Sequence, residues 1–424
     1  DELMNLIEDL RWRGLLAQST AEKALLESLK KPITLYVGFD PTAPSLHAGN
    51  LVVLLVLRRF QLAGHNPIAL VGGATGLVGD PSGKNEERTL NSNEIVEGWV
   101  NRIRKQVSAF LDFDAQKNPA AVVNNLDWTS PLSAIEFLRD IGKHFSVNQM
   151  LSKESVAARL ESGGISYTEF SYQVLQSYDF LELYRRNNCT LQVGGSDQWG
   201  NIVAGLDLIR RVEQGSGHAL TVPLLMKADG TKFGKTAGGS VWLDPEMTSP
   251  YAFFQFWLNS DDKDVINFLK VFSFKSHEEI SELEKSHNEN PGLREAHRAL
   301  ARELTSLVHS EGTTQRVEAA ARALFGQGDL AELDEATLTS ALAELPRTTV
   351  SSTDEIPTWV DLLAATGVVD SKSAARRIVK EGGAYLNNQK ISGEDFRPSK
   401  SDFLCGKYAV LRKGKRDLAA VELT

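Results

Sequence analysis

Cysteine and long hydrophobic runs are both scarce in this 424-residue chain, and each scarcity excludes a class of protein. The two cysteines, Cys189 and Cys405, are too few for a disulfide framework or a thiolate zinc site, so a reducing, cytoplasmic setting is expected. The longest strictly apolar run, Leu51 to Leu57, is far shorter than the ~20 residues that cross a membrane. Hydrophobic residues at 42% and charged residues at 24% are typical of a globular protein with a sizeable core.

Positive charge is also in short supply, since the chain carries a net charge of −9. The charge is divided unevenly, because residues 357–424 carry +4 and the remainder carries −13. An acidic body with a basic C-terminal segment indicates that a polyanion, if one is bound, is met partly at this end. Taken alone, the asymmetry is better explained by ordinary surface variation.

Strand and helix patterns alternate in the first part of the chain. An apolar run at residues 33–38 is followed by an apolar helical pattern at 47–62, which Gly64 ends, and by a second strand pattern at 68–71. Strand, helix and strand within about 40 residues form the βαβ unit of a parallel sheet. We therefore predict a doubly wound, Rossmann-like α/β domain that binds ligands beyond the carboxyl ends of its strands.

The pattern changes after Trp242. Apolar residues at helical spacing, such as Leu300, Leu304 and Leu307, predict an all-α part, and the basic C-terminal segment reads as a small α+β domain. The predicted organisation is a catalytic domain at residues 1–240, a helical domain at 241–345, a linker at 346–356 and an α+β domain at 357–424.

Two segments carry groups suited to phosphate. His47-Ala48-Gly49-Asn50 stands at the first strand–helix junction, where a helix N-terminus offers free N–H groups and partial positive charge, and where Gly49 leaves room for a flat ring. The segment 232–236 carries two lysines on a glycine-containing loop that could close over a polyphosphate. Taken singly, a capping loop and a solvated turn are the better explanations of these two segments.

The glycine-rich segment 72–84 matches neither common nucleotide motif. Its glycines from Gly73 are spaced G-x-x-G-x-x-G, whereas a dinucleotide fingerprint needs G-x-G-x-x-G. A phosphate loop ending at Lys84 would need glycine where Val78 stands. Neither a dehydrogenase nor a P-loop ATPase is therefore expected.

Polar side chains recur in two further places. Tyr172, Gln176 and Asp179 are spaced i, i+4, i+7 and would share one helix face. Asp197 and Gln198 follow a strand pattern and could reach a site at the carboxyl edge of the sheet. A solvated helix face and a helix cap are the plainer interpretations.

In order and combination, these segments closely resemble the bacterial tyrosyl-tRNA synthetases, which are class I enzymes. The resemblance rests on residues 36–42, 47–50, 194–201 and 232–236, and it covers nearly the whole chain. Residues 371–377 resemble the S4-type RNA-binding module of such enzymes. The resemblance implies that the helical domain at 241–345 binds the anticodon region and that the S4-like domain at 357–424 binds the rest of the tRNA. The resemblance implies a ligase that joins tyrosine to ATP, releasing pyrophosphate, and then passes the tyrosyl group to the terminal adenosine of tRNA(Tyr).

The resemblance also implies roles for individual residues. It places around tyrosine Tyr36, Asp80, Tyr172, Gln176, Asp179 and Gln198. It places around ATP Gly38, Asp40, His47, Gly49, Asn50, Asp197 and Lys235. The implied catalytic and phosphate-binding set is Thr42, His47, Lys84, Arg88, Lys232, Lys235 and Thr236. The implied contacts with tRNA phosphates are Arg376, Arg377, Lys380, Arg412, Lys413, Lys415 and Arg416.

Substrate choice, by this resemblance, depends on the phenol group. Tyr36 and Asp179 are expected to hydrogen-bond the substrate hydroxyl, and phenylalanine would leave both buried and unpaired. Mg²⁺ is implied with ATP, held by phosphate oxygens and water, and no tightly bound protein metal site is expected. The resemblance also implies a homodimer, and no membrane partner is expected.

Two alternatives stay open. A class I relative specific for tryptophan would not need the Tyr36–Asp179 pair, and a non-catalytic RNA-binding protein would use only the basic C-terminal segment. The sequence also departs from the family pattern, because Asn50 stands where a histidine is common. Val37 and Val53 stand where some relatives carry polar groups near the ribose.

Overall fold

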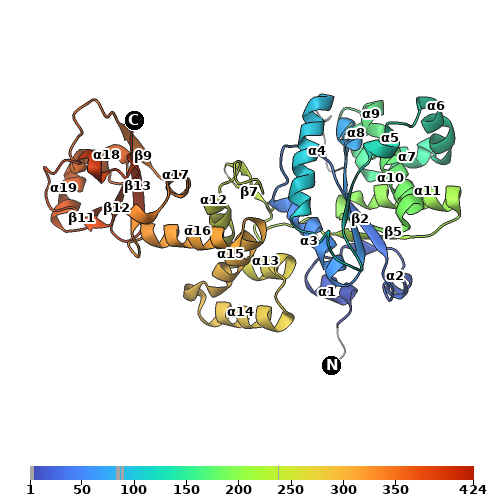
Figure 1. The fold of residues 1–424 in the computed structure, drawn as a ribbon, viewed down its shortest axis with the longest axis horizontal. Coiled ribbons are helices and arrows are strands. Elements are labelled where there is room, and N and C mark those ends of the chain that lie inside the picture. The colour runs from blue at the N-terminus through green and yellow to red at the C-terminus, as the bar shows by residue number, and fades with distance from the viewer. Residues whose placement is uncertain (1–3, 83–85, 87–89, 237) are drawn as a thin grey trace. The chain divides into compact units, whose positions relative to one another are not determined.

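The computed structural model describes residues 4–82, 86, 90–236 and 238–424 (Figure 1). The chain divides into two compact units, of which the first comprises residues 1–247 and 260–300 and the second comprises residues 248–259 and 301–424. Within the described residues, no helix is both long and apolar enough to cross a bilayer.

The first unit is built on a six-stranded sheet with the order β1-β6-β5-β2-β3-β4. Its strands are β1 (Gln18–Ser19), β2 (Thr34–Phe39), β3 (Asn66–Val71), β4 (Ala121–Asn124), β5 (Cys189–Gly195) and β6 (His218–Val222). All pairs are parallel except the short edge strand β1, which is antiparallel to β6. The predicted doubly wound parallel sheet is thus confirmed, and its strand order reverses between β2 and β5, where such sheets bind ligands.

Helix α3 (Ala48–Leu62) is the crossover from β2 to β3. His47 caps it, because the His47 Nδ1 accepts a hydrogen bond from Gly49 N and the Asn50 side chain accepts one from His47 N. Most of its apolar residues are fully buried, which explains why the helix is apolar on nearly every side. The cap fixes the N-terminus of α3 at the carboxyl edge of the sheet.

Two long helices pack closely together on the sheet beside the reversal point. They are α10 (Tyr172–Asn187) and α11 (Trp199–Glu213). Gly205 on α11 allows this approach, since a Cβ there would lie 3.1 Å from the Phe180 side chain. Phe180 is fully buried and meets the ring of Tyr36 edge-on, with 5.4 Å between ring centroids. The core therefore supports the side chain of Tyr36 from behind.

Shorter helices complete the first unit. They are α1 (Leu6–Trp12), α2 (Glu22–Ser28), α4 (Asn93–Ser108), α5 (Leu126–Thr129), α6 (Ala134–Glu136), α7 (Val147–Ser152), α8 (Glu154–Ser162), α9 (Tyr167–Phe170), α13 (Val265–Phe272) and α14 (His277–Glu289). Helix α15 (Glu295–Val308) begins in the first unit and ends in the second.

The first unit includes helices that the sequence assigned to a separate helical domain. Buried Arg13 donates hydrogen bonds to the carbonyl oxygens of Lys270, Ser273 and Lys275, and Arg59 donates to the same oxygen of Ser273. These bonds tie the segment after α13 to the N-terminal part of the chain. The predicted boundary at residue 240 therefore differs from the division between the units, and helical periodicity could not reveal which neighbour a helix packs against.

The second unit contains α12 (Pro250–Leu258), α16 (Glu311–Leu324), α17 (Glu335–Leu342), α18 (Trp359–Thr366) and α19 (Lys372–Lys380). Its five-stranded sheet has the order β11-β10-β12-β13-β9. The strands are β9 (Arg347–Val350), β10 (Ala384–Leu386), β11 (Gln389–Lys390), β12 (Tyr408–Lys413) and β13 (Asp417–Leu423). Trp359 and Leu411 lie in its buried core.

The structure differs from the sequence prediction in the segment 346–356, which was interpreted as a linker. Residues 347–350 form β9, which pairs in parallel with β13 from the end of the chain. The residues Arg347-Thr348-Thr349-Val350 have β propensity, but they are too few and too polar to show a strand pattern. Only their distant partner strand makes them part of a sheet.

Phe180→Ala is expected to lower the free energy of unfolding by about 3–5 kcal/mol, because it removes a fully buried ring that contacts Tyr36 and Gly205. Chemical denaturation of the full chain measures this change. The matched control is Leu62→Ala, at a site that is 68% exposed, where the change should stay within about 0.5 kcal/mol. Equal effects of the two substitutions would contradict the packing described here.

Candidate active site

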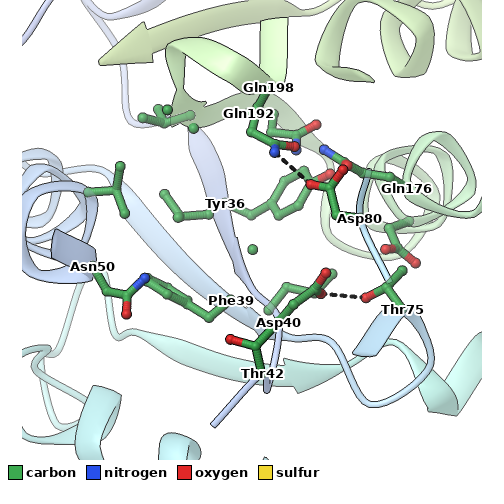
Figure 2. Close-up of a pocket in the computed structure, with 18 of the residues that line it drawn as sticks. Tyr36, Phe39, Asp40, Thr42, Asn50, Thr75, Asp80, Gln176, Gln192 and Gln198 are labelled. Atoms are coloured by element: carbon green, nitrogen blue, oxygen red, sulfur yellow. Dashed lines mark hydrogen bonds between the residues drawn. The ribbon is translucent and has the colours of Figure 1, made fainter. Parts of the chain in front are cut away.

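A pocket of about 220 Å³ lies at the carboxyl ends of β2 and β5, where the strand order reverses (Figure 2). It brings together residues from four separate stretches of the chain, 36–53, 70–80, 172–179 and 192–198. The lining includes all six residues assigned to tyrosine, namely Tyr36, Asp80, Tyr172, Gln176, Asp179 and Gln198. It also includes Gly38, Asp40, Thr42 and Asn50 from the sets assigned to ATP and phosphate, together with Val37 and Val53.

The hydroxyl group of Tyr36 is buried in the wall of this pocket and makes no hydrogen bond. Burial, and then the charge of nearby Asp179, raises the pKa of the Tyr36 hydroxyl well above its usual value, so the group is a neutral donor. A buried donor without a partner costs about 1–3 kcal/mol. The site therefore favours a ligand that presents a hydrogen-bond acceptor to Tyr36.

Asp179 faces the same pocket from α10 and is 2% exposed. Trp128 Nε1 donates a hydrogen bond of 2.8 Å to one of its carboxylate oxygens, and Asn125 Nδ2 donates one of 3.0 Å to the other. Burial raises the pKa of Asp179 to about 7, although these two donors act in the opposite direction. The sequence analysis missed Trp128 and Asn125. Each lies more than 50 residues before Asp179, in a segment that carries no recognisable motif.

Asn125 links Asp179 to the glycine-rich turn after β3. Its Oδ1 accepts a hydrogen bond from Ala74 N, and its Nδ2 also donates to Thr75 Oγ1. Thr75 in turn donates to one oxygen of Asp40. Gly72 is required beside this group, because a Cβ there would lie 2.1 Å from Asp40 Oδ1.

Asp40, which was assigned to ATP, contacts two other residues of the pocket lining. Tyr172 donates a hydrogen bond to Asp40 Oδ2, while Thr75 donates to Oδ1. Burial, and then the charge of Asp40, raises the pKa of Tyr172 well above its usual value. Asp40 thus orients Tyr172, which is a role that the sequence analysis did not predict.

A second polar group lines the opposite side, where Figure 2 shows Asp80, Gln176, Gln192 and Gln198 close together. Asp80 accepts hydrogen bonds from Gln198 Nε2 at 2.7 Å and from Ser82 N. Gln176 Oε1 accepts one from buried Asn201, and Gln192 Oε1 has no partner. Carboxylate and amide oxygens gathered in this way suit a positively charged ammonium group.

The lysine-containing segment lies against the start of α3. Ala48 N donates a hydrogen bond to Val241 O, and a Cβ on Gly234 would lie 3.4 Å from Gly49 N. Phe233 anchors the segment, because its ring packs on Phe268 and Phe272 of α13 at centroid distances of 5.1 and 5.2 Å. The structure therefore joins the two segments that were singled out separately as phosphate-binding.

Several predicted residues stand at the edge of this site or outside it. Lys232, Lys235 and Thr236 are exposed, the last two on β7 (Lys235–Thr236), which pairs with β8 (Gly239–Ser240). His47, Gly49 and Asp197 do not line the pocket, although His47 and Gly49 begin α3 and Asp197 follows β5 directly. Lys84 and Arg88 lie outside the described residues.

The seven residues assigned to tRNA all belong to the second unit. Arg376, Arg377 and Lys380 are exposed on α19, and Lys415 and Arg416 are exposed at the turn between β12 and β13. Arg412 and Lys413 end β12 and are half-buried, and the Arg412 guanidinium lies over the Tyr385 ring at 4.1 Å. Lys380 also forms an ion pair of 3.2 Å with Glu394.

Comparisons with known proteins agree along the whole chain. The model of the tRNA synthetases class I (W and Y) matches residues 27–326, and that of the tyrosine--tRNA ligase SYY-like C-terminal domain matches residues 337–421. The chain is 62% identical to a tyrosine--tRNA ligase of Streptomyces coelicolor and 58% identical to one of Thermobifida fusca. The matches cover 99–100% of this chain and 100% of each relative.

Solved structures of tRNA synthetases resemble this chain in fold. A C-terminally truncated mitochondrial tyrosyl-tRNA synthetase of Aspergillus nidulans superposes with a TM-score of 0.69 at 29% identity, over 76% of this chain and 95% of that one. A tryptophanyl-tRNA synthetase of Encephalitozoon cuniculi, at a TM-score of 0.52 and 14% identity, covers 73% of this chain and 87% of its own. At that identity the second likeness concerns the fold alone.

Tyr36→Phe is expected to leave the free energy of unfolding unchanged or to raise it by about 1 kcal/mol, because it removes a buried hydroxyl that has no partner. Asn125→Ala should instead lower it by about 2–3 kcal/mol, because Ala74 N and Asp179 Oδ2 are each deprived of a hydrogen bond. Denaturation of the ligand-free protein measures both changes. A clear loss of stability in Tyr36→Phe would show that the hydroxyl does have a partner.

Proposed function

The chain belongs to the class I tRNA synthetases of the tryptophan and tyrosine group, and on this premise we propose that the pocket in Figure 2 is where it activates its amino acid. Its function is tyrosine–tRNA ligation. Tyrosine and ATP give tyrosyl-adenylate and pyrophosphate, and the tyrosyl group then passes to the 3′-terminal adenosine of tRNA(Tyr).

One observation carries the assignment of the pocket: an unpartnered, buried Tyr36 hydroxyl that lies beside a buried carboxylate. A phenol satisfies both groups, because its oxygen accepts from Tyr36 while its O–H donates to Asp179. Phenylalanine offers neither function. The indole N–H of tryptophan can donate but cannot accept, so it would leave Tyr36 unpaired. This argument favours tyrosine over the tryptophan alternative.

The opposite side of the pocket would bind the amino-acid backbone. We assign the substrate ammonium to Asp80, Gln176 and Tyr172, with Gln198 beside the carboxylate. Asp40 acts through Tyr172, whose hydroxyl it holds, and is therefore a positioning residue. Val37 and Val53 present no polar atom from their side chains, so contacts with the ribose fall to Asn50, Asp197 and backbone groups.

The chemistry needs alignment and charge stabilisation rather than a protein nucleophile. An oxygen of the tyrosine carboxylate attacks the α-phosphorus of ATP, and the P–O bond to pyrophosphate breaks with its electron pair remaining on the pyrophosphate oxygen. We assign the outer phosphates to Thr42, His47 and the N-terminus of α3. Lys232, Lys235 and Thr236 would form a clamp over the leaving group, and Gly49 would lie under the adenine.

Other ligands and partners complete the proposal. Mg²⁺ would accompany ATP on phosphate oxygens and water, because the described pocket offers few carboxylates besides those already hydrogen-bonded to the protein. Lys84 and Arg88 are proposed as further phosphate ligands from the family resemblance alone. A homodimer in the cytoplasm is proposed on the same ground, and the two free cysteines are compatible with a reducing compartment.

Pyrophosphate exchange with tyrosine, phenylalanine and tryptophan tests the assignment directly. We expect tyrosine-dependent exchange, with the preference for tyrosine over phenylalanine in kcat/KM falling about tenfold in Tyr36→Phe and about 10–100-fold in Asp179→Asn. Each variant loses one hydrogen bond to the substrate. The bond lost in Asp179→Asn involves a charged group, so its expected effect is the larger of the two.

The matched control for these variants is Tyr178→Phe, which removes a hydroxyl from the residue before Asp179 without touching the pocket lining. Its preference should match that of the unmodified protein. Exchange with tryptophan but not tyrosine would overturn the assignment, and no exchange with any amino acid would favour the non-catalytic alternative.

Replacing basic residues of the second unit by glutamine should weaken tRNA binding and reduce its salt dependence, while adenylate formation stays unchanged. Each phosphate interaction that the substitutions remove should lower the slope of log K against log salt by about 0.7–0.9. The variant changes Arg376, Arg377, Lys415 and Arg416. Its control neutralises four exposed lysines of the first unit, Lys23, Lys30, Lys31 and Lys117. An equal slope in the two variants would refute the assignment of these residues to tRNA binding.

A further inference from the structure

Two histidines and one aspartate meet away from the pocket, among the helices of residues 260–300 in the first unit. Asp262 lies in the loop before α13, His287 lies in the last turn of α14, and His297 lies in the first turn of α15. One potential ligand atom from each residue lies within 4.8 Å of the others. The three residues come from three different elements, so their meeting is a product of the tertiary fold.

The arrangement of His287 is typical of a metal ligand. Its Nε2 lies 2.8 Å from the backbone oxygen of Asp262, which fixes the hydrogen on Nε2 and leaves the lone pair on Nδ1. That Nδ1 is buried and has no hydrogen-bond partner. In known metal sites a histidine ligand usually donates its second ring N–H to a carbonyl or carboxylate in this way.

His297 has an unsatisfied ring in the same place. The residue is fully buried, and neither ring nitrogen makes a hydrogen bond of normal geometry. Its polar neighbours are Asp262 Oδ1, which lies 3.2 Å from Nε2, and the backbone of Ser260. A neutral imidazole keeps one lone pair, and an ion bound to that lone pair of His297 would stabilise it in this buried place.

We propose that Asp262, His287 and His297 form a site for one Zn²⁺ ion, with water in the remaining position. Two imidazole nitrogens and one carboxylate oxygen are a ligand set that Zn²⁺ prefers, whereas Mg²⁺ and Ca²⁺ prefer oxygen alone. Tetrahedral ligands at ~2.0–2.1 Å from zinc are about 3.3 Å apart. The Asp262 side chain is 61% exposed, and its Oδ1 already lies 3.2 Å from His297 Nε2, which is close to that spacing.

A nearby positive charge disfavours cation binding at this cluster. Burial and then the charge of nearby Arg294 lower the pKa of His297, and the same guanidinium would repel a cation. The affinity must therefore come from direct coordination. The loop that carries Asp262 also contacts the lysine-containing segment. Asp264 in this loop accepts, through Oδ1, a hydrogen bond of 2.8 Å from Ala228 N at the base of that segment.

The sequence analysis expected no protein-held metal, and the spacing explains why this cluster was not noticed. The three residues are 25 and 10 positions apart in the chain, which is no recognised metal motif, and each looks like an ordinary surface residue in its own segment. These three side chains lie apart from the proposed tyrosine-activating pocket, so zinc binding can be tested independently of it.

Zinc titration of the tag-free, chelator-treated full chain tests the proposal. Isothermal calorimetry should show one Zn²⁺ bound per chain, and Co²⁺ in its place should give the visible absorption bands of a four- or five-coordinate ion. Asp262→Asn and His287→Gln should each weaken zinc binding at least tenfold, since removing even a partner of a metal ligand costs about that much. Both residues are at least partly exposed, so the variants should fold, and circular dichroism checks this.

The matched control is His144→Gln, at a partly exposed histidine of the first unit that is outside the cluster. It should bind zinc as the unmodified chain does. The proposal is overturned if the chain binds no zinc at micromolar concentration. It is also overturned if Asp262→Asn and His287→Gln, shown to be folded, bind zinc as tightly as the control does.

Discussion

The carboxylate of Asp179 has to accept a hydrogen bond in a place where burial favours its protonated form. With a pKa of about 7, Asp179 is balanced between the two forms near neutral pH. Trp128 and Asn125 hold that balance, because each donates a hydrogen bond to one carboxylate oxygen and so favours the charged state. Without them, burial would shift Asp179 further towards its protonated form.

Several hydrogen bonds and packing contacts position this carboxylate and the hydroxyl of Tyr36. Asn125 connects Asp179 to the turn after β3 and, through Thr75, to Asp40 and Tyr172, so the two ends of the amino acid would be read by one network. Phe180 supports the ring of Tyr36 from behind. A change in the packing of α10 on the sheet would therefore alter specificity before it altered phosphate binding.

The sequence predicted the residues that line the pocket better than the residues that hold them in place by hydrogen bonds. Spacing on α10 placed Tyr172, Gln176 and Asp179 on one face, and the pocket confirms that all three line it. Asn125 and Trp128 could not be found in this way, because their meaning depends on a partner more than 50 residues away. The sequence did not predict strand β9 or the boundary between the units for the same reason. Strand β9 depends on pairing with β13, and the boundary depends on hydrogen bonds from Arg13, and both partners are distant in the chain.

The segment with the two lysines shows how the helices after residue 260 bear on catalysis. Phe233 lies between the lysines and is buried against Phe268 and Phe272, while Asp264 holds Ala228 at the base of the segment. Lys232 and Lys235 are exposed on either side of that anchor. The backbone between them is therefore anchored while both side chains reach solvent, an arrangement compatible with the proposed clamp over a triphosphate. A helix that the sequence assigned to a separate helical domain thus supports the segment with the two lysines, in agreement with the place of α13 in the first unit.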